Sequence, residues 1–286
     1  MSIRSKRANW TLIILGLTAG VAASDQTATA PSTAPATSRA VTQPATLPAV
    51  DPEIDKILTR LEEREVHDLH AKLSWRQQYV TDLEEDAVTK NGEIWYQKSQ
   101  PVAKFLIHFT ESIAGGRKDK LDEQHLFDGC WYTELQSRTK TLTRREVRKP
   151  DDPGDPYKLG QGVFPLPFGQ KKQDVLREFA VQLVPPAASD PPATDHLLLV
   201  PRPKTQTSQT YKSLDVWISQ EGATAGLPVK VRAAKLKGTG QLDSYITTTF
   251  SDAQLNPSFS SGLFEIKAPS GYEVIEERLE PAAPPP

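Results

Sequence analysis

The sequence predicts a mainly β domain of the α+β class, in which a strongly curved antiparallel sheet forms an incomplete β-barrel. Three observations lead to this fold class. About ten short stretches alternate apolar and polar residues, and turn residues separate them at intervals of about 8 to 12 residues. One stretch near the N-terminus has helical periodicity instead. A sheet of this size is expected to curl, with an amphipathic helix and a short helix or loop as its lid.

The first residues are typical of an export signal. The segment starts with three basic residues, Arg4, Lys6 and Arg7. An apolar run over 10–21 follows and leads into small residues at Ala23. This run is shorter than the roughly 20 residues that a membrane-spanning helix needs. We therefore expect a signal peptide over 1–23, cleaved near Ala23, and a mature protein in the periplasm.

Two further segments are expected to be disordered because they lack apolar residues to bury. They are the Ala/Thr/Pro-rich linker over 24–50 and the Pro-rich tail over 280–286. One large domain, 51–279, remains between them. Cys130 is the only cysteine, so an intramolecular disulfide is excluded and packing must supply the stability. The formal net charge of −2 argues against nucleic acid as a partner.

The domain is expected to begin with an amphipathic helix over 51–64. Asp51 is a suitable N-cap, Pro52 suits the first helical position, and Glu53 places an acid in the first turn. Apolar residues then recur at helical spacing and form one face, at Ile54, Ile57, Leu58 and Leu61. This face must pack on something apolar.

From about residue 69 the periodicity changes to that of strands. Strands are predicted over 69–76, 94–96, 105–109, 126–127, 130–132 and 139–143. Asn91-Gly92 predicts a turn before the second strand, and the segment 114–117 ends the third. Asp128-Gly129 predicts a hairpin turn.

The second half of the domain repeats this pattern after a long loop. A short helix is expected over 171–178, and a Pro/Ala/Asp-rich loop over 185–194. Strands are predicted over 179–184, 196–200, 214–218, 227–232, 244–250, 264–266 and 272–274.

The loop over 149–170 is polar and Pro-rich first, then apolar. Its apolar part cannot enter a sheet interior because prolines remove ladder donors. A loop with this much apolar surface is expected to cover something, and its candidates are Phe164, Leu166 and Phe168. These side chains either form a movable lid or plug the sheet permanently.

Three segments, in order along the chain, resemble motifs of the LolA-like periplasmic lipoprotein carriers. Segment 92–96 resembles the Gly-x-Leu-Trp strand of that family, and 126–132 resembles its Asp-Gly hairpin. Segment 245–275 resembles its C-terminal signature, in which Phe-x-hydrophobic-x-x-Pro-x-Gly-x-x-Val is matched by Phe264, Pro269, Gly271 and Val274. The family has an Arg before the proline that follows the first motif. Here Gln100 precedes Pro101, and Lys98 is the nearest basic residue.

The resemblance implies a half-barrel domain over 51–279 that carries acyl chains of lipoproteins or lipids towards the outer membrane. It also implies an inner-membrane donor protein, an outer-membrane acceptor protein and a monomeric carrier. The alternative is an envelope-stress sensor or protein-binding module on the same fold. The missing cysteine at the signal junction favours a shuttle that is not lipid-anchored.

No catalytic, cofactor or metal site is predicted. His108 and His125 have no nucleophile signature or metal-ligand spacing around them, so a structural role is expected and the protein is not expected to be an enzyme. The strand aromatics either line a lipid cavity or fill the core. The candidate residues of the acyl cavity or lid are Ile54, Leu58, Leu61, Trp75, Ile94, Tyr96, Phe105, Ile107, Phe109, Trp131, Phe164, Leu166 and Phe168.

Overall fold

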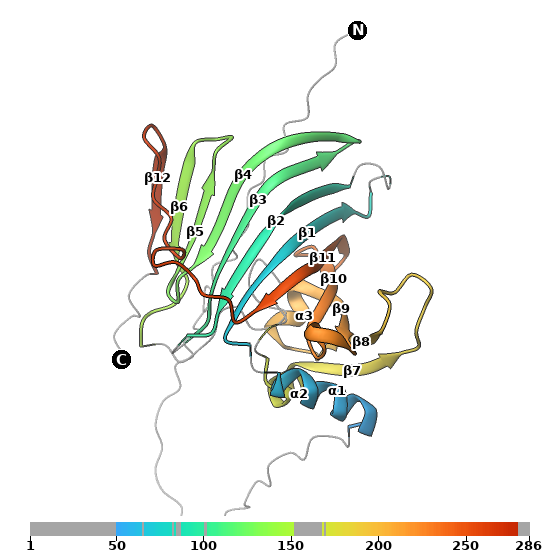
Figure 1. Cartoon of the computed structure of the whole chain (residues 1–286). Coiled ribbons are helices and arrows are strands. Elements are labelled where there is room, and N and C mark those ends of the chain that lie inside the picture. The colour runs from blue at the N-terminus through green and yellow to red at the C-terminus, as the bar shows by residue number, and fades with distance from the viewer. Residues whose placement is uncertain are drawn as a thin grey trace, which may run out of the picture. The chain divides into compact units, whose positions relative to one another are not determined.

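Twelve strands form a single sheet in the computed structural model (Figure 1), which describes residues 50–64, 66–81, 83, 87–99, 102–151, 168 and 170–279. The strands of the first half are β1 (Asp68–Tyr79), β2 (Val88–Gln97), β3 (Lys104–Ala114), β4 (Arg117–Phe127), β5 (Trp131–Gln136) and β6 (Thr141–Glu146). Those of the second half are β7 (Phe179–Val184), β8 (Thr194–Pro201), β9 (Tyr211–Ser219), β10 (Pro228–Leu236), β11 (Leu242–Leu255) and β12 (Glu273–Glu277).

The sheet consists of two meanders that meet at its centre. Strands β1 to β6 follow one another in sequence, as do β7 to β11, and the two meanders join because β1 pairs with β11. In that pairing Leu73 lies opposite Phe250. All neighbours are antiparallel except β12, which pairs with β6 in parallel at the far edge. The prediction of a mainly β domain is confirmed, and the predicted antiparallel sheet is found except for the parallel β12–β6 pair.

The sheet is open and not strongly curled, which corrects the expected strongly curved, incomplete barrel. Its edges are β12 and β7, at opposite ends of the strand order. Figure 1 shows that strand direction rotates steadily from β6 to β7. This is the twist that every sheet accumulates from strand to strand.

The predicted N-terminal helix is confirmed as α1 (Pro52–Glu63). The side chain of Asp51 caps it by accepting a hydrogen bond of 2.8 Å from the Glu53 amide. Its four predicted apolar residues are all buried. The predicted short helix is also confirmed, as α2 (Lys172–Glu178). Lys172 of α2 pairs with Asp55 of α1 at 2.9 Å, so the two helices lie side by side.

The core lies on one face of the sheet, called here the inner face. On β1 this face carries Leu69, Ala71, Leu73, Trp75 and Gln77, which alternate with more exposed residues. Apolar residues of the inner face, of α1 and of α2 belong to one continuous buried cluster. The helices therefore add their apolar faces to the core of the sheet.

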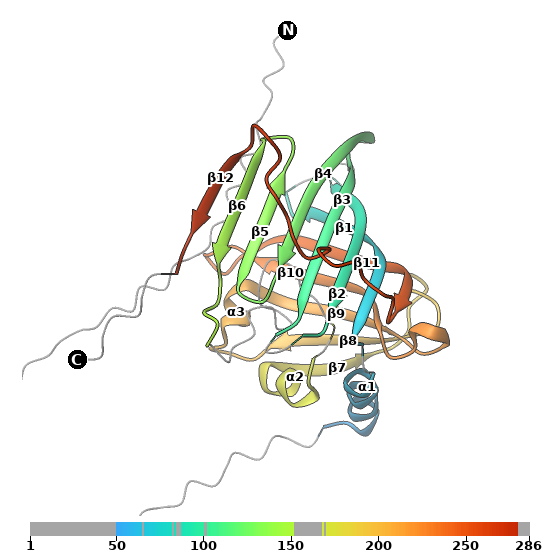
Figure 2. The ribbon, with the colours of Figure 1, turned by 60° about the vertical axis from the view of Figure 1, so that its left-hand side comes forward.

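The opposite, outer face is covered in part by the segment 256–272. This segment leaves the end of β11 and crosses the sheet to reach β12 in both views (Figure 2). Asn256 anchors its start, because the Asn256 amide donates to the Asp68 carbonyl at 2.8 Å. Leu106 and Leu126 point to this face and are nevertheless buried. The segment thus supplies a cover for the outer face.

Several predicted details are wrong. Asn91-Gly92 is not a turn but lies inside β2, at an irregularity in its pairing with β3. The segment 264–266 is not a strand, because it belongs to the irregular crossing over the outer face. Strand β4 begins at Arg117, well before the predicted 126. The structure also contains a short helix that the sequence patterns do not predict, α3 (Gln206–Thr210).

Other predictions fall on residues that the structure does not describe. These are the signal peptide over 1–23, the linker as far as 49, Phe164, Leu166 and the tail over 280–286. None of the described helices combines the length and apolarity needed to cross a membrane.

Candidate functional site: an apolar pocket and a buried polar network

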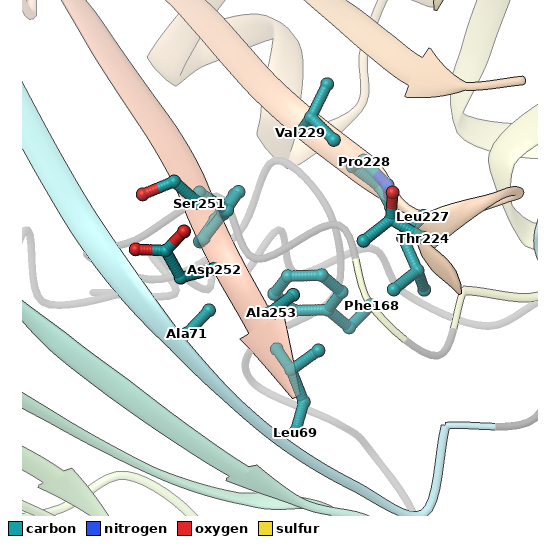
Figure 3. Close-up of a pocket in the computed structure, with 11 residues that line it drawn as sticks. Leu69, Ala71, Phe168, Thr224, Leu227, Pro228, Val229, Ser251, Asp252 and Ala253 are labelled. Carbon is teal, nitrogen blue, oxygen red and sulfur yellow. The ribbon is translucent and has the colours of Figure 1, made fainter. Parts of the chain in front are cut away.

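An apolar pocket opens where β1, β11 and β10 meet (Figure 3). Its volume is about 170 Å³. The residues that line it come from the start of β1, the end of β11, the start of β10 with the preceding turn, and the segment before α2. They are Leu69, Ala71, Phe168, Thr224, Leu227, Pro228, Val229, Phe250, Ser251, Asp252 and Ala253. The lining is therefore mostly apolar, and Asp252 is its one ionisable group.

Two irregularities in strand pairing border the pocket. The β1–β11 register shifts between His70 and Lys72, beside a positive φ of 52° at Asp252. The β10–β9 register shifts between Pro228 and Lys230. Extra residues in a strand bend it and leave backbone unpaired, which is common beside binding sites. Both shifts occur at residues next to or in the pocket wall, so we attribute the opening to them.

Phe168 closes one side of the pocket. Its ring lies 5.0 Å from the Phe250 ring at an interplanar angle of 65°, and 5.9 Å from the Tyr96 ring. Figure 3 shows it between β11 and Leu227. Phe168 is buried, and it is the last apolar residue of the loop expected to be a lid or plug. Aromatic contacts of this kind are worth about 1 kcal/mol each beyond the burial of the ring, so they add to the packing that holds Phe168 in place.

The end of helix α1 contacts a turn beside the pocket that contains the 3₁₀ helix η2 (Gly222–Thr224). Arg64 at the end of α1 donates to the Ala223 carbonyl at 2.5 Å, and Arg60 is paired with Asp195 of β8. Gly226 lies so close that an added Cβ would be 3.2 Å from the Arg60 carbonyl oxygen. The turn that supplies Thr224 and Leu227 is therefore clamped by the end of α1.

The pocket suits a short apolar group rather than a whole lipid. A dry cavity of about 150 Å³ lined by apolar side chains is known to accept a molecule the size of benzene. Drug-sized ligands occupy pockets of about 300 Å³ or more. A longer hydrocarbon chain would require Phe168 to move away from Phe250.

A buried polar network lies on the inner face at β2, β4 and β5. Lys90 donates to both carboxylate oxygens of Glu123, at 2.6 and 2.7 Å. His125 Nε2 donates to Glu123 Oε1 at 2.7 Å, and His125 Nδ1 lies 2.7 Å from the Tyr132 hydroxyl. Glu123, His125 and Tyr132 are all at most 8% exposed. Buried charges of this kind are tolerated only when they are paired and hydrogen-bonded.

Burial alone would raise the pKa of Glu123, but its partners outweigh that effect. Hydrogen bonds and positive charge from His125 and Lys90 lower the pKa of the carboxyl from 4.5 to about 2. Glu123 is therefore ionised throughout the neutral range.

Three of the potential metal ligands in the described residues come together here. Donor atoms of Glu123, His125 and Glu134 lie within 4.8 Å of one another. However, Lys90 binds both oxygens of Glu123, and both His125 nitrogens face protein groups. A cation would have to displace the lysine, so the cluster fits an internal ion-pair network better than a metal site.

Among the predicted site residues that the structure describes, only Phe168 lines the pocket. The core cluster contains Ile54, Leu58, Leu61, Trp75, Ile94, Tyr96, Phe105, Ile107 and Phe109. Trp131 is not in that cluster; it is half-buried, and the guanidinium groups of Arg144 and Arg278 lie 4.9 and 5.7 Å from its ring centroid.

The sequence predictions do not include the pocket wall from β10 and β11 or the polar network. Glu123, His125 and Phe127 alternate along β4, which is the signal that places Glu123 and His125 on one face. The predicted strand begins only at residue 126, so it does not include Glu123 and His125 and their alternation is missed. The bulges beside Ala71 and Val229 have no clear sequence signal.

No protein-family model and no curated protein matches this chain. Solved structures resemble its backbone weakly. An uncharacterized conserved protein from Thermus thermophilus has a TM-score of 0.45 at 10% identity, covering 79% of this chain and 99% of that chain. A DUF1329 family protein from Desulfovibrio piger has 0.39 at 10%, covering 74% and 96%. A LolA superfamily protein from Nitrosomonas europaea has 0.38 at 12%, covering 74% and 97%. At these identities and TM-scores, the resemblances establish neither family membership nor activity.

Proposed function

We propose that this protein is a non-enzymatic carrier that binds the acyl chain of a lipid or lipoprotein in the pocket between β1, β10 and β11. The observation that carries the proposal is an apolar pocket closed by Phe168, the last aromatic residue of the predicted lid loop. Exposing hydrocarbon to water costs about 0.8 kcal/mol per CH₂, so a carrier must hide the chain and release it again. A ring held by two aromatic contacts suits that cycle.

The proposal includes the periplasm as the working compartment and the outer membrane as the destination. It is supported there by the predicted signal peptide and by the three motif segments, and it implies a donor and an acceptor protein at the two membranes. The small volume of the pocket sets a condition for binding an acyl chain. Phe168 must swing aside before more than a short part of an acyl chain can enter.

Titration with a fluorescent fatty acyl probe tests the proposal. We expect saturable binding to the purified protein. Ala253→Leu, which fills the pocket, should abolish it, whereas the exposed Ala180→Leu on β7 should leave it unchanged. Phe168→Ala should speed both association and dissociation, with Phe264→Ala on the outer crossing segment as control. Absence of saturable binding by the unmodified protein would overturn the proposal.

A further inference from the structure

The inner face changes from apolar to polar just beyond the pocket. Lys90, Trp75 and Thr248 are direct neighbours in one row across β2, β1 and β11. We call them the polar row. The Lys90 ammonium lies 5.6 Å from the Trp75 ring centroid. The row is thus a set of polar groups in the interior of the domain, adjacent to the Glu123–His125 network.

Two polar atoms of this row are buried without a partner. Trp75 Nε1 and Thr248 Oγ1 have no hydrogen-bond partner among the residues that the structure describes. The two residues are only 8% and 4% exposed. Leaving a buried polar group unsatisfied is costly, so such groups in a native protein call for an explanation such as a bound water, an ion or a ligand.

The row and the pocket lie on one continuous strip of the inner face. Phe250 lines the pocket, and Thr248 is two residues before it on the same face of β11, about 7 Å away at the usual strand rise. Ala71 lines the pocket, and Trp75 is about 13 Å further along β1. Leu73, buried and opposite Phe250, lies between them. This interval is apolar and packed, so a hydrocarbon chain that reached from the pocket to the row would have to displace Phe168 and pass over Leu73 and Phe250.

The charge of the polar row indicates which polar group of a ligand it could bind. Glu123 already engages the Lys90 ammonium through two hydrogen bonds, so the donors of the row that remain without a partner, the indole and the hydroxyl, are uncharged. An indole N–H and a hydroxyl can both donate to an acceptor oxygen. An uncharged carbonyl matches these donors better than a phosphate or carboxylate, whose charge would stay unpaired in the interior.

We propose that Trp75 and Thr248 bind the carbonyl oxygen of an ester- or amide-linked acyl chain whose hydrocarbon end occupies the pocket. This inference rests on the proposed carrier function and narrows its ligand to acyl derivatives that retain the carbonyl. Phe168 lines the pocket and packs on Phe250, the pocket residue nearest the row along β11, so it is the side chain we expect to move when the ligand enters.

The test compares two probes that differ in one oxygen. Methyl palmitate carries the carbonyl, and hexadecyl methyl ether is the same chain without it. Both are delivered from cyclodextrin and compete with the fluorescent acyl probe for the purified protein. We expect the ester to bind about fivefold more tightly, as one hydrogen bond predicts. Thr248→Val and Trp75→Phe should each reduce this preference, and the double variant should bring the two probes to parity.

Thr249→Val is the matched control, because Thr249 is exposed and points to the outer face. It should leave the preference unchanged. Thr248→Val should not lower the melting temperature, since it removes a buried hydroxyl that has no partner among the described residues. Lower ester affinity with unimpaired stability is a result that a purely structural role would not produce. With a ¹³C-labelled ester, the carbonyl infrared band should shift to lower frequency on binding and return when Thr248 is replaced.

The outcomes separate the two proposals. If ester and ether bind equally tightly, the polar row has no role and the carrier function stands. If neither binds, the carrier function fails and this inference fails with it. If free palmitate binds more tightly than its methyl ester and Thr248→Val abolishes that difference, the row binds an anion and the carbonyl assignment is wrong.

Discussion

The ammonium group of Lys90 donates to both carboxylate oxygens of Glu123, at 2.6 and 2.7 Å, on the buried inner face of the sheet. Burial works against the ionised carboxyl, but His125 and Lys90 lower its pKa from 4.5 to about 2. As the pH falls below 4.5, Glu123 is therefore protonated in the unfolded chain, whereas in the folded chain it stays ionised until about pH 2. The carboxylate thus contributes about 3 kcal/mol at neutral pH, which is lost as the pH falls towards the folded-state pKa.

Urea unfolding across the acid range, from neutral pH downwards, measures this contribution. Glu123→Gln should lower the free energy of unfolding at neutral pH by about 3 kcal/mol, because it leaves Lys90 and His125 without their carboxylate. Its stability should then fall less on acidification than that of the unmodified protein. Glu62→Gln, on the exposed face of α1, serves as control. An unchanged acid slope in Glu123→Gln would contradict the assignment.

Replacing Gly92 with Ala should be one of the most damaging small substitutions in the sheet. An added Cβ would lie 2.0 Å from the His108 carbonyl oxygen and 2.7 Å from the Phe109 Cα, both of them backbone atoms that cannot rotate away. We expect a loss of about 3 kcal/mol in the free energy of unfolding, measured by urea denaturation. Gly238→Ala, which meets no atom within 4 Å, should change it by less than about 0.5 kcal/mol. Equal effects at both glycines would show that β2 and β3 are not in this contact.

Helix α1 should contribute to stability through its buried face. Leu58 is 2% exposed and belongs to the core cluster, so Leu58→Ala should cost about 2 to 5 kcal/mol through lost burial and the cavity left behind. Lys56→Ala, on the exposed face of the same helix, should cost almost nothing. Thermal unfolding followed by circular dichroism distinguishes the two. A negligible cost at Leu58 would mean that α1 is not packed on the core.

The edge strand β12 should depend on side chains for its attachment. Arg278 lies over the Trp131 ring and donates to Glu276 at 2.9 and 2.6 Å, next to the parallel pairing of β12 with β6. Arg278→Ala should increase hydrogen exchange of the β12 amides several-fold without changing exchange in β9. Lys267→Ala, in the crossing segment, is the control. Exchange in β12 that is the same in both variants would show that the backbone pairing alone holds the strand.

Much of the fold is predictable from local pattern because apolar and polar residues alternate in the sequence where buried and exposed residues alternate along the strands. The Asp51-Pro52 start and the apolar spacing of α1 are local signals, as is the hairpin turn at Asp128, whose side chain accepts hydrogen bonds from the Cys130 and Trp131 amides. The predicted bounds of β7 agree with those in the structure.

The wrong predictions share a physical cause, which is that distant partners decide the outcome. Asn91-Gly92 is a dipeptide typical of turns. In this structure Gly92 instead lies within β2, where the lack of a Cβ allows the backbone of β3 to approach closely. The first part of β4 carries charges on both faces because it extends beyond the core, so it shows no apolar alternation. The pocket depends on register shifts between strands that are far apart in sequence. Phe168 is predictable because an apolar side chain in a Pro-rich loop is conspicuous without any partner.

The pairing of β1 with β11 also governs the order in which the domain can assemble. Each meander is made of neighbouring strands, so each can collect its contacts over short loops. Joining them requires closing a loop over most of the domain, and such non-local pairing is slow. Until β11 arrives, β1 and β10 present bare edges, which are templates for aggregation. In a nascent chain, β1 therefore stays unpaired on its β11 side until nearly the last strand has been synthesised, and during that interval the chain is most exposed to aggregation.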